Sequence, residues 1–266
     1  MYELIIFATM ISRNQIKYVQ SLRLKKFRDQ HGVFIAEGDK IVAELIGSKL
    51  PVKMLFALEE WVNLHRQNIS ENIDLHVVSG KELERISNLK TPNKALALVH
   101  KPQNLFPGEI FSEGLVLMLD KIQDPGNLGT ILRTADWFGV RHVICSSDTA
   151  DVYNPKTIQS SMGSFIRVQT CYTDLSPCID RLDEEVTVYG AFPDASDLYA
   201  VKPTLPAVLV VGNESKGISA EVAERIDQKL MIPSGIKDLQ NRAESLNAAM
   251  ATGIILSWLS KSTQAK

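Results

Sequence analysis

The feature of this sequence that most constrains its fold is a series of short apolar runs separated by amphipathic segments. In the second part of the chain these runs predict six strands, at residues 115–119, 142–145, 165–168, 186–192, 207–211 and 229–232. Helical periodicity separates them, at residues 130–138, 154–162, 174–183, 219–226 and 244–260. Strands that are apolar along their whole length and alternate with helices are typical of a parallel sheet covered on both faces. We therefore predict an α/β domain over residues 105–266.

Residues 1–104 predict a second, smaller α/β domain. Its strands are expected at residues 33–35, 52–58, 75–78 and 95–99, and its helices at residues 12–30, 41–46, 59–67 and 81–86. Ser12 is suited to cap the first helix, because its side-chain oxygen can accept a hydrogen bond from a free backbone N–H group. Residues 101–114 contain Pro107 and Gly108 and show no periodicity, so we expect the linker between the two domains there.

The composition is that of a soluble globular protein, with 266 residues of which 45% are hydrophobic and 23% are charged. No apolar stretch approaches the roughly 20 residues that cross a bilayer. The N-terminal MYELIIFATMI has no basic region and no clear cleavage site, which argues against a signal peptide; whether Met1 or Met10 is the native start stays open. Cys145, Cys171 and Cys178 are odd in number and lack metal-type spacing, so we predict a cytoplasmic protein without a disulfide framework or a metal site.

Positive charge is concentrated in the first domain, although the whole chain has a net charge of −2. Residues 1–104 hold 15 basic and 11 acidic side chains, whereas residues 105–266 hold 14 and 20. Between positions 12 and 30 a single acid, Asp29, stands among six basic residues: Arg13, Lys17, Arg23, Lys25, Lys26 and Arg28. Such a cluster can bind phosphates, and a solvated helix face explains it equally well.

A first polar motif, DPGNLGTILRTADWFGV at residues 124–140, follows the apolar run 115–119. We expect a loop that contains Asn127 and Gly129, followed by a helix from about Thr130 that carries Arg133. An arginine presents a fork of donors that suits phosphate. The alternative is structural, with Asn127 bonded to its own loop and Arg133 paired with a nearby acid: Asp120, Asp124 or Asp136.

A second motif, VLVVGNESKGIS at residues 208–219, runs from a strand into a loop. It has neither the GxxxxGK[ST] order of a phosphate-binding loop nor the GxGxxG order of a dinucleotide site. Its backbone groups and Glu214 could still bind an adenosine group at the end of the strand. The alternative is a helix start, with Ser219 as its cap.

A third motif, MIPSGIKDLQNRAESLNAAMATGIILSWL at residues 231–259, passes from a strand through a polar loop into a helix expected from about Glu244. Ser245 and Asn247 then lie at the helix entrance, where free backbone N–H groups also point outward. Small residues follow, namely Ala248, Ala249, Ala251 and Gly253, and they allow another backbone to pack closely. An ordinary C-terminal helix docked on the sheet is the alternative.

In this order and at these spacings, the three motifs resemble the signature motifs of the SpoU-type RNA ribose 2′-O-methyltransferases of the SPOUT superfamily. The matching positions are Asn127, Gly129 and Arg133; Gly212, Glu214 and Gly217; and Ile232, Pro233, Ser245, Leu246 and Asn247. The resemblance covers about residues 115–260. The first domain is similar, less specifically, to the ribosomal protein L30e fold that binds the substrate in many of these enzymes. The loop with IKDLQNRA is longer than is usual in the family.

The resemblance implies a deep trefoil knot in the second domain and S-adenosylmethionine as the methyl donor. It implies that the donor is bound by Gly212, Ile232, Leu246, Ala191 and Phe192, and that the catalytic side chains are Arg133, Asn127, Glu214, Ser245 and Asn247. The basic residues between positions 12 and 30 would bind RNA. It further implies a homodimer with its active site at the subunit interface, and an RNA partner rather than DNA or a membrane. Large-subunit (23S) ribosomal RNA is favoured over transfer RNA by analogy.

Two other classes of protein remain to be distinguished. An RNA-binding protein that keeps this fold but lacks catalysis is one, and the presence of Asn127, Arg133, Glu214 and Asn247 argues against it. A nucleotide-dependent oxidoreductase on a doubly wound sheet is the other, and the lack of GxGxxG after any predicted strand argues against that class.

Overall fold

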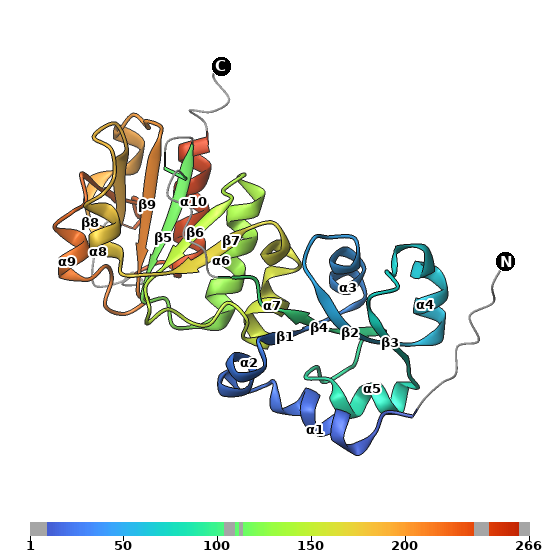
Figure 1. The fold of residues 1–266 in the computed structure, drawn as a ribbon. Coiled ribbons are helices and arrows are strands. Elements are labelled where there is room, and N and C mark those ends of the chain that lie inside the picture. The colour runs from blue at the N-terminus through green and yellow to red at the C-terminus, as the bar shows by residue number, and fades with distance from the viewer. Residues whose placement is uncertain (1–9, 104–109, 112–113, 237–244, 261–266) are drawn as a thin grey trace. The chain divides into compact units, whose positions relative to one another are not determined.

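The computed structural model describes residues 10–103, 110–111, 114–236 and 245–260, and the chain divides into two units (Figure 1). The first unit comprises Met1–Gln103 and Tyr153–Ile166, and the second comprises Asn104–Val152 and Arg167–Lys266. Two predicted features fall mainly outside the described residues, namely the linker at residues 101–114 and the long loop before Ser245. In the part of the chain that is described, no helix has the length and apolar character needed to span a membrane.

The first unit is a four-stranded sheet with helices on both faces. Its strand order is β1-β4-β2-β3, from β1 (Val33–Glu37), β2 (Val52–Ala57), β3 (Asp74–Val77) and β4 (Ala95–His100). β4 is antiparallel to both of its neighbours, and β2 and β3 are parallel. One face packs against α1 (Arg13–Ser21), α2 (Lys25–His31) and α5 (Gly80–Ile86), and the other against α3 (Asp39–Ile46) and α4 (Glu59–His65).

The helix predicted over residues 12–30 is two helices in the structure, because the chain turns between α1 and α2. Ser12 caps α1 as predicted, in a capping box with Gln15. At the turn, Arg28 is only 1% exposed and its Nη1 donates to the carbonyl oxygens of Leu22 and Arg23, at 2.9 and 2.7 Å. Arg28 therefore fastens α2 to the end of α1. Its prediction as an RNA-binding side chain is wrong, because the guanidinium is buried.

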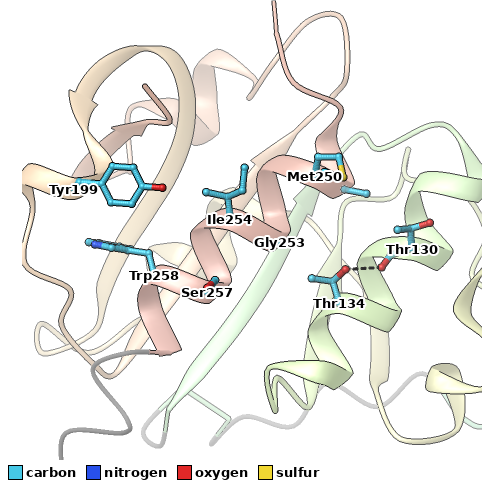
Figure 2. Close-up of a pocket in the computed structure, with 9 residues that line it drawn as sticks. Thr130, Thr134, Tyr199, Met250, Gly253, Ile254, Ser257 and Trp258 are labelled. Carbon is cyan, nitrogen blue, oxygen red and sulfur yellow. Dashed lines mark hydrogen bonds between the residues drawn. The ribbon is translucent and has the colours of Figure 1, made fainter. Parts of the chain in front are cut away.

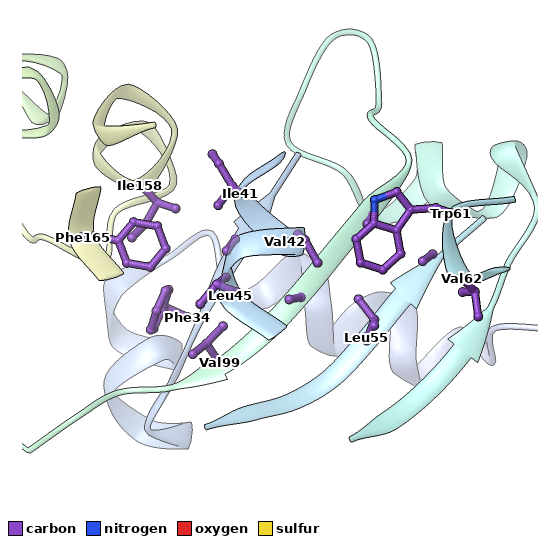
Figure 3. Close-up of a cluster of buried hydrophobic side chains, with 14 of the residues drawn as sticks. Phe34, Ile41, Val42, Leu45, Leu55, Trp61, Val62, Val99, Ile158 and Phe165 are labelled. Atoms are coloured by element: carbon purple, nitrogen blue, oxygen red, sulfur yellow. The ribbon is translucent and has the colours of Figure 1, made fainter. Parts of the chain in front are cut away.

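The segment Tyr153–Ile166 packs on the first unit, although the sequence placed it in the second domain. It contains α7 (Pro155–Ser161), which was predicted as a helix at residues 154–162. Phe165 lies edge-on to the ring of Phe34 on β1, with centroids 5.8 Å apart, and Ile158 belongs to the same core (Figure 3). The strand predicted at residues 165–168 is therefore wrong, because Ser164–Ile166 forms a 3-10 turn and the strand begins at Gln169.

The second unit is a six-stranded parallel sheet, which confirms the predicted α/β architecture. The strand order is β10-β8-β9-β5-β6-β7, from β5 (Leu115–Asp120), β6 (His142–Cys145), β7 (Gln169–Tyr172), β8 (Thr187–Asp197), β9 (Ala207–Gly212) and β10 (Gln228–Met231). α8 (Leu175–Ile179) and α9 (Ala220–Ala223) pack on one face. On the other face α6 (Pro125–Trp137) and α10 (Ala248–Ser260) pack against each other (Figure 1).

The strand order reverses between β5 and β9. From β5 the chain continues outward to β6 and β7, and it then returns on the other side of β5 to form β8, β9 and β10. In open parallel sheets such a reversal is where ligands bind, beyond the carboxyl ends of the strands. The segments that follow β5 and β9 are the first and second polar motifs, so the topology brings these two motifs to one edge of the sheet.

The first helix of the second unit begins five residues before its predicted start. Pro125 occupies its first turn, and the side chain of Asp124 caps it by accepting a hydrogen bond from the N–H of Asn127 at 2.9 Å. Asn127 and Gly129 therefore lie in the helix, and their prediction as loop residues is wrong. At α10, Asn247 provides the cap, since its Oδ1 accepts from the N–H of Ala249 at 2.9 Å.

Arg28→Ala should lower the free energy of unfolding by about 2–3 kcal/mol, because one buried and one partly buried carbonyl group lose a charged donor. Denaturant unfolding of this variant and of Lys26→Ala, which alters an exposed neighbour on α2, measures the effect. The control should stay within about 0.5 kcal/mol of the parent. Equal stability of the two variants would contradict the structural role of Arg28.

Candidate active site

The side chain of Asn127 joins the three polar motifs. Its Nδ2 donates to Oε1 of Glu214 at 2.8 Å, and its Oδ1 accepts from Nδ2 of Asn247 at 2.9 Å. Its own position is set by Asp124, which holds the N–H of Asn127 at the start of α6. Only a side chain with both a donor and an acceptor can make these two bonds at once. Asn127, Glu214 and Asn247 were each predicted as site residues, and the structure brings all three together.

The loop after β9 is held in a tight fold by Asn213. Its backbone pairs with Gly217, its Oδ1 accepts from the N–H groups of Ser215 and Lys216, and its Nδ2 donates to the carbonyl of Lys121 at 2.8 Å. A side chain at Gly212 would place a Cβ only 2.3 Å from the backbone of Gly217. Glycine is therefore required there by the loop itself.

The two ends of the loop are tied to the end of β5, since Asn213 bonds to Lys121 and Ser219 bonds to Asp120. Oδ2 of Asp120, at the end of β5, accepts from the N–H of Ser219 at 2.7 Å. Ser219 occupies the cap position of α9, as the alternative interpretation of the second motif expected, but its side chain makes no capping hydrogen bond. Glu214 thus stands on a loop whose base is fixed on both sides.

Arg133 lies on the exposed side of α6 and makes no hydrogen bond or ion pair with the residues that the structure describes. The acid nearest in sequence, Asp136, pairs instead with Arg141 at 3.4 Å and with Arg167 at 2.8 Å. The other two candidate acids also have other partners. Asp120 accepts a hydrogen bond from the N–H of Ser219, and Asp124 accepts one from the N–H of Asn127. The charge of Arg133 is therefore available for a ligand, which favours the functional interpretation over a salt bridge.

Of the residues predicted to hold the methyl donor, Gly212 ends β9, Ile232 follows β10, Leu246 precedes α10, and Ala191 and Phe192 lie within β8. Residues 191–195 bulge out of the sheet, since Gly190 pairs with Lys229 while Ser196 pairs with Leu230. This bulge contains Ala191 and Phe192, and the ammonium of Lys229 lies 5.1 Å from the ring of Phe192.

Ile232 follows β10 directly, and Leu246 stands one residue before the α10 cap, with 51% of its surface exposed. An exposed leucine beside polar backbone fits contact with an apolar ring such as adenine. Ser245, which was predicted as catalytic, is exposed and is not part of the Asn127 network. These residues supply backbone groups at Gly212 and Ile232 and apolar side chains at Leu246 and Phe192, a combination that fits an adenosine-containing donor.

The basic residues between positions 12 and 30 differ in their exposure and in their interaction partners. Arg13, Lys17 and Lys26 are exposed. Lys25 pairs with Asp29 at 2.6 Å, and Arg23 donates to the carbonyl of Ser87 at 2.7 Å. On α1 and α2, the positive charges of Arg13, Lys17 and Lys26 are therefore the most available to bind phosphate.

An apolar groove between α6 and α10 was not predicted from the sequence. It has a volume of about 400 Å³ and is lined by Thr130, Thr134, Tyr199, Ala249, Met250, Gly253, Ile254, Ser257 and Trp258 (Figure 2). The sequence feature that could have indicated this groove is the run of small residues in the third motif. Among these, Gly253 faces Thr134, where an added Cβ would lie 3.6 Å from the threonine methyl group.

The three cysteines are buried free thiols. Burial raises the pKa values of Cys171 and Cys178 to about 11 each, and it also raises the pKa of Cys145. A thiol must lose its proton to act as a nucleophile or a metal ligand. The cysteines are therefore core residues and not part of the site.

Comparison with known proteins agrees with this geometry. Residues 114–257 match the model of the SpoU rRNA Methylase family, and residues 13–97 match that of the MRM3-like substrate binding domain. A Bacillus subtilis protein named 23S rRNA (guanosine(2553)-2′-O)-methyltransferase RlmP is 32% identical over 92% of this chain and 96% of its own.

Two solved structures are similar over nearly the whole chain. A putative RNA methyltransferase of the TrmH family from Porphyromonas gingivalis is 38% identical, with a TM-score of 0.83 over 94% of this chain and 98% of its own. An AdoMet-bound rRNA methyltransferase from Sinorhizobium meliloti is 27% identical, with a TM-score of 0.82 over 96% and 97%. The chain therefore belongs to the SpoU rRNA methylase family, the RNA 2′-O-methyltransferases that use S-adenosylmethionine.

Proposed function

We propose that this protein methylates a ribose 2′-OH of large-subunit ribosomal RNA in the cytoplasm. The observation that carries the proposal is the Asn127 network, which assembles the three family motifs at the start of α6, the helix that also carries Arg133, an arginine with no ion pair among the described residues. The choice of RNA is supported by the Bacillus subtilis relative, which is named for 23S rRNA. The match of residues 13–97 to a substrate-binding domain supports it further.

Arg133 is proposed to act on the substrate through its charge. The bound donor supplies an electrophilic methyl group, and the 2′-OH must lose its proton as it attacks. A guanidinium has a pKa above about 12, so Arg133 is a poor proton acceptor. We assign to it the binding of the phosphate next to the reactive ribose and the stabilisation of negative charge on the ribose oxygen.

The other polar side chains are proposed to orient the groups that react. Asn127 keeps the carboxylate of Glu214 in one position, and Asn247 fixes the start of α10 against both. Ser245 stands next to this network and completes the polar surface. The donor would be held by backbone groups at Gly212 and Ile232, with Leu246, Ala191 and Phe192 providing apolar contact. Positioning of this kind accounts for a large part of many enzymatic rate enhancements.

A homodimer is proposed to form through the groove between α6 and α10. The groove exposes Met250 and Tyr199, and Met250 lies within one helical turn of Asn247. Exposed apolar surface of this kind marks an interface, and an interface between two copies is the commonest arrangement in soluble oligomers. A second copy placed there would complete a site that stands at the edge of one subunit.

Arg133→Ala should reduce the methylation rate by roughly 100- to 1,000-fold, as the loss of one group that stabilises transition-state charge does in other enzymes. Affinity for S-adenosylmethionine, measured by calorimetry, should stay within about threefold, because Arg133 contacts the substrate and not the donor. Arg181→Ala, which removes an exposed arginine after α8, is the matched control and should keep parental activity. Near-normal turnover by Arg133→Ala would overturn the assignment.

Asn127→Asp should be more harmful than Asn127→Ala, because it places a second carboxylate against Glu214 where a donor stood. Such a pair raises the pKa of one carboxyl group, so the repulsion is present at high pH and is lost as pH falls through that raised value. Thermal unfolding should show that Asn127→Asp is less stable than Asn127→Ala by roughly 1–2 kcal/mol at about pH 8. This difference in stability should disappear as the pH falls towards about 5. A difference in stability that does not change with pH would contradict the contact between residue 127 and Glu214.

Lys17→Glu combined with Lys26→Glu should weaken RNA binding and flatten its dependence on salt. Each lost phosphate contact reduces the slope of log K against log salt by about 0.7–0.9. Filter binding of a 23S rRNA transcript across a salt series measures the slope. Lys49→Glu, an exposed change after α3 on the opposite face of the first unit, is the control. If the double variant and the Lys49→Glu control showed the same dependence of RNA affinity on salt, the RNA would bind to another surface.

A further inference from the structure

Trp137, the last residue of α6, is 84% exposed. It follows Arg133 by four positions, so the two side chains lie on the same side of the helix as neighbours. Trp137 is not among the residues that line the groove between α6 and α10. A tryptophan has a large apolar surface, and leaving it in water is unfavourable unless a partner covers it.

The surface around Trp137 is positively charged. Asp136 is the residue before it, with a side chain that is only 15% exposed, and it accepts hydrogen bonds from Nε of Arg167 at 2.8 Å and from Nη1 of Arg141 at 3.4 Å. These contacts hold two partly exposed arginines, Arg141 and Arg167, on the residue that precedes Trp137. Together with Arg133, these two arginines and Asp136 give a net charge of +2 at this end of α6.

An exposed indole among arginines is suited to single-stranded RNA. Proteins recognise unpaired RNA by stacking bases on aromatic rings and by contacting the flanking phosphates with arginine. The target ribose must be accessible to the donor, so the strand around it must leave regular pairing at least locally. Arg133 and Trp137 are about one helical turn apart, so a strand with one phosphate on Arg133 can reach Trp137 with a neighbouring base.

We propose that Trp137 stacks on a base adjacent to the methylated nucleotide, and that Arg141 and Arg167 bind the phosphates that flank this base. The proposal rests on the proposed function and adds a substrate subsite to it. An interface formed by two copies of this patch would instead bring two sets of arginines together, and their like charges would repel. The charge therefore favours RNA as the molecule that covers Trp137.

Trp137→Ala should raise KM for a 23S rRNA transcript and weaken its binding by roughly tenfold, within the range measured for the loss of one base–aromatic stack. Trp137→Phe should retain most of the affinity, because phenylalanine keeps a π face. Affinity for S-adenosylmethionine should not change in either variant. Leu64→Ala, which removes an exposed apolar side chain from the first unit, is the control.

The outcomes separate the subsite from the proposed function. If the parent protein does not methylate the transcript, the proposed function fails for that RNA, and the binding comparison alone decides the subsite. Equal RNA affinity of the parent and Trp137→Ala would overturn the subsite. A change in oligomeric state by light scattering in Trp137→Ala, without a change in RNA affinity, would overturn it in favour of a second copy.

Discussion

The amide of Asn127 is the contact on which the rest of the site depends. It links side chains that are 87 and 120 residues away in the sequence, at the end of β9 and at the start of α10. Each hydrogen bond contributes only about 1 kcal/mol to stability, so its importance lies in geometry rather than in energy. Asp124 fixes the helix end, Asn127 fixes Glu214, and Asn247 fixes the start of the last helix. This chain of contacts fixes the relative positions of Asn127, Glu214 and Asn247.

The parallel sheet and the three motifs could be predicted from the sequence, because both depend on local patterns. Unbroken apolar strands indicate burial on both faces, and the strand ends then gather at one edge. The start of α6 was missed although Asp124-Pro125 is a favourable cap followed by a first-turn proline. The glycines and the asparagine that follow were interpreted as a loop. In the structure Leu128 and Ile131 are buried, and their burial stabilises this stretch as part of the helix.

Other features depend on tertiary contacts that no local pattern reports. Arg28 looks like a surface residue in the sequence, and only the turn between α1 and α2 creates the two carbonyl acceptors that bury it. The same holds for Arg133, whose availability is decided by the other partners of Asp120, Asp124 and Asp136. The trefoil knot of the second unit follows from the SPOUT fold and has no signature in composition, since true knots are almost absent from proteins in general.

The segment Tyr153–Ile166 has a consequence for how such a protein can evolve. Because this segment belongs to the first unit, the backbone passes between the two units three times, after Gln103, after Val152 and after Ile166. A new substrate-binding half could not be exchanged by recombination at a single linker, since Phe34 would lose the aromatic rings of Tyr153 and Phe165 that cover it. The two halves are therefore expected to diverge together as one inherited unit.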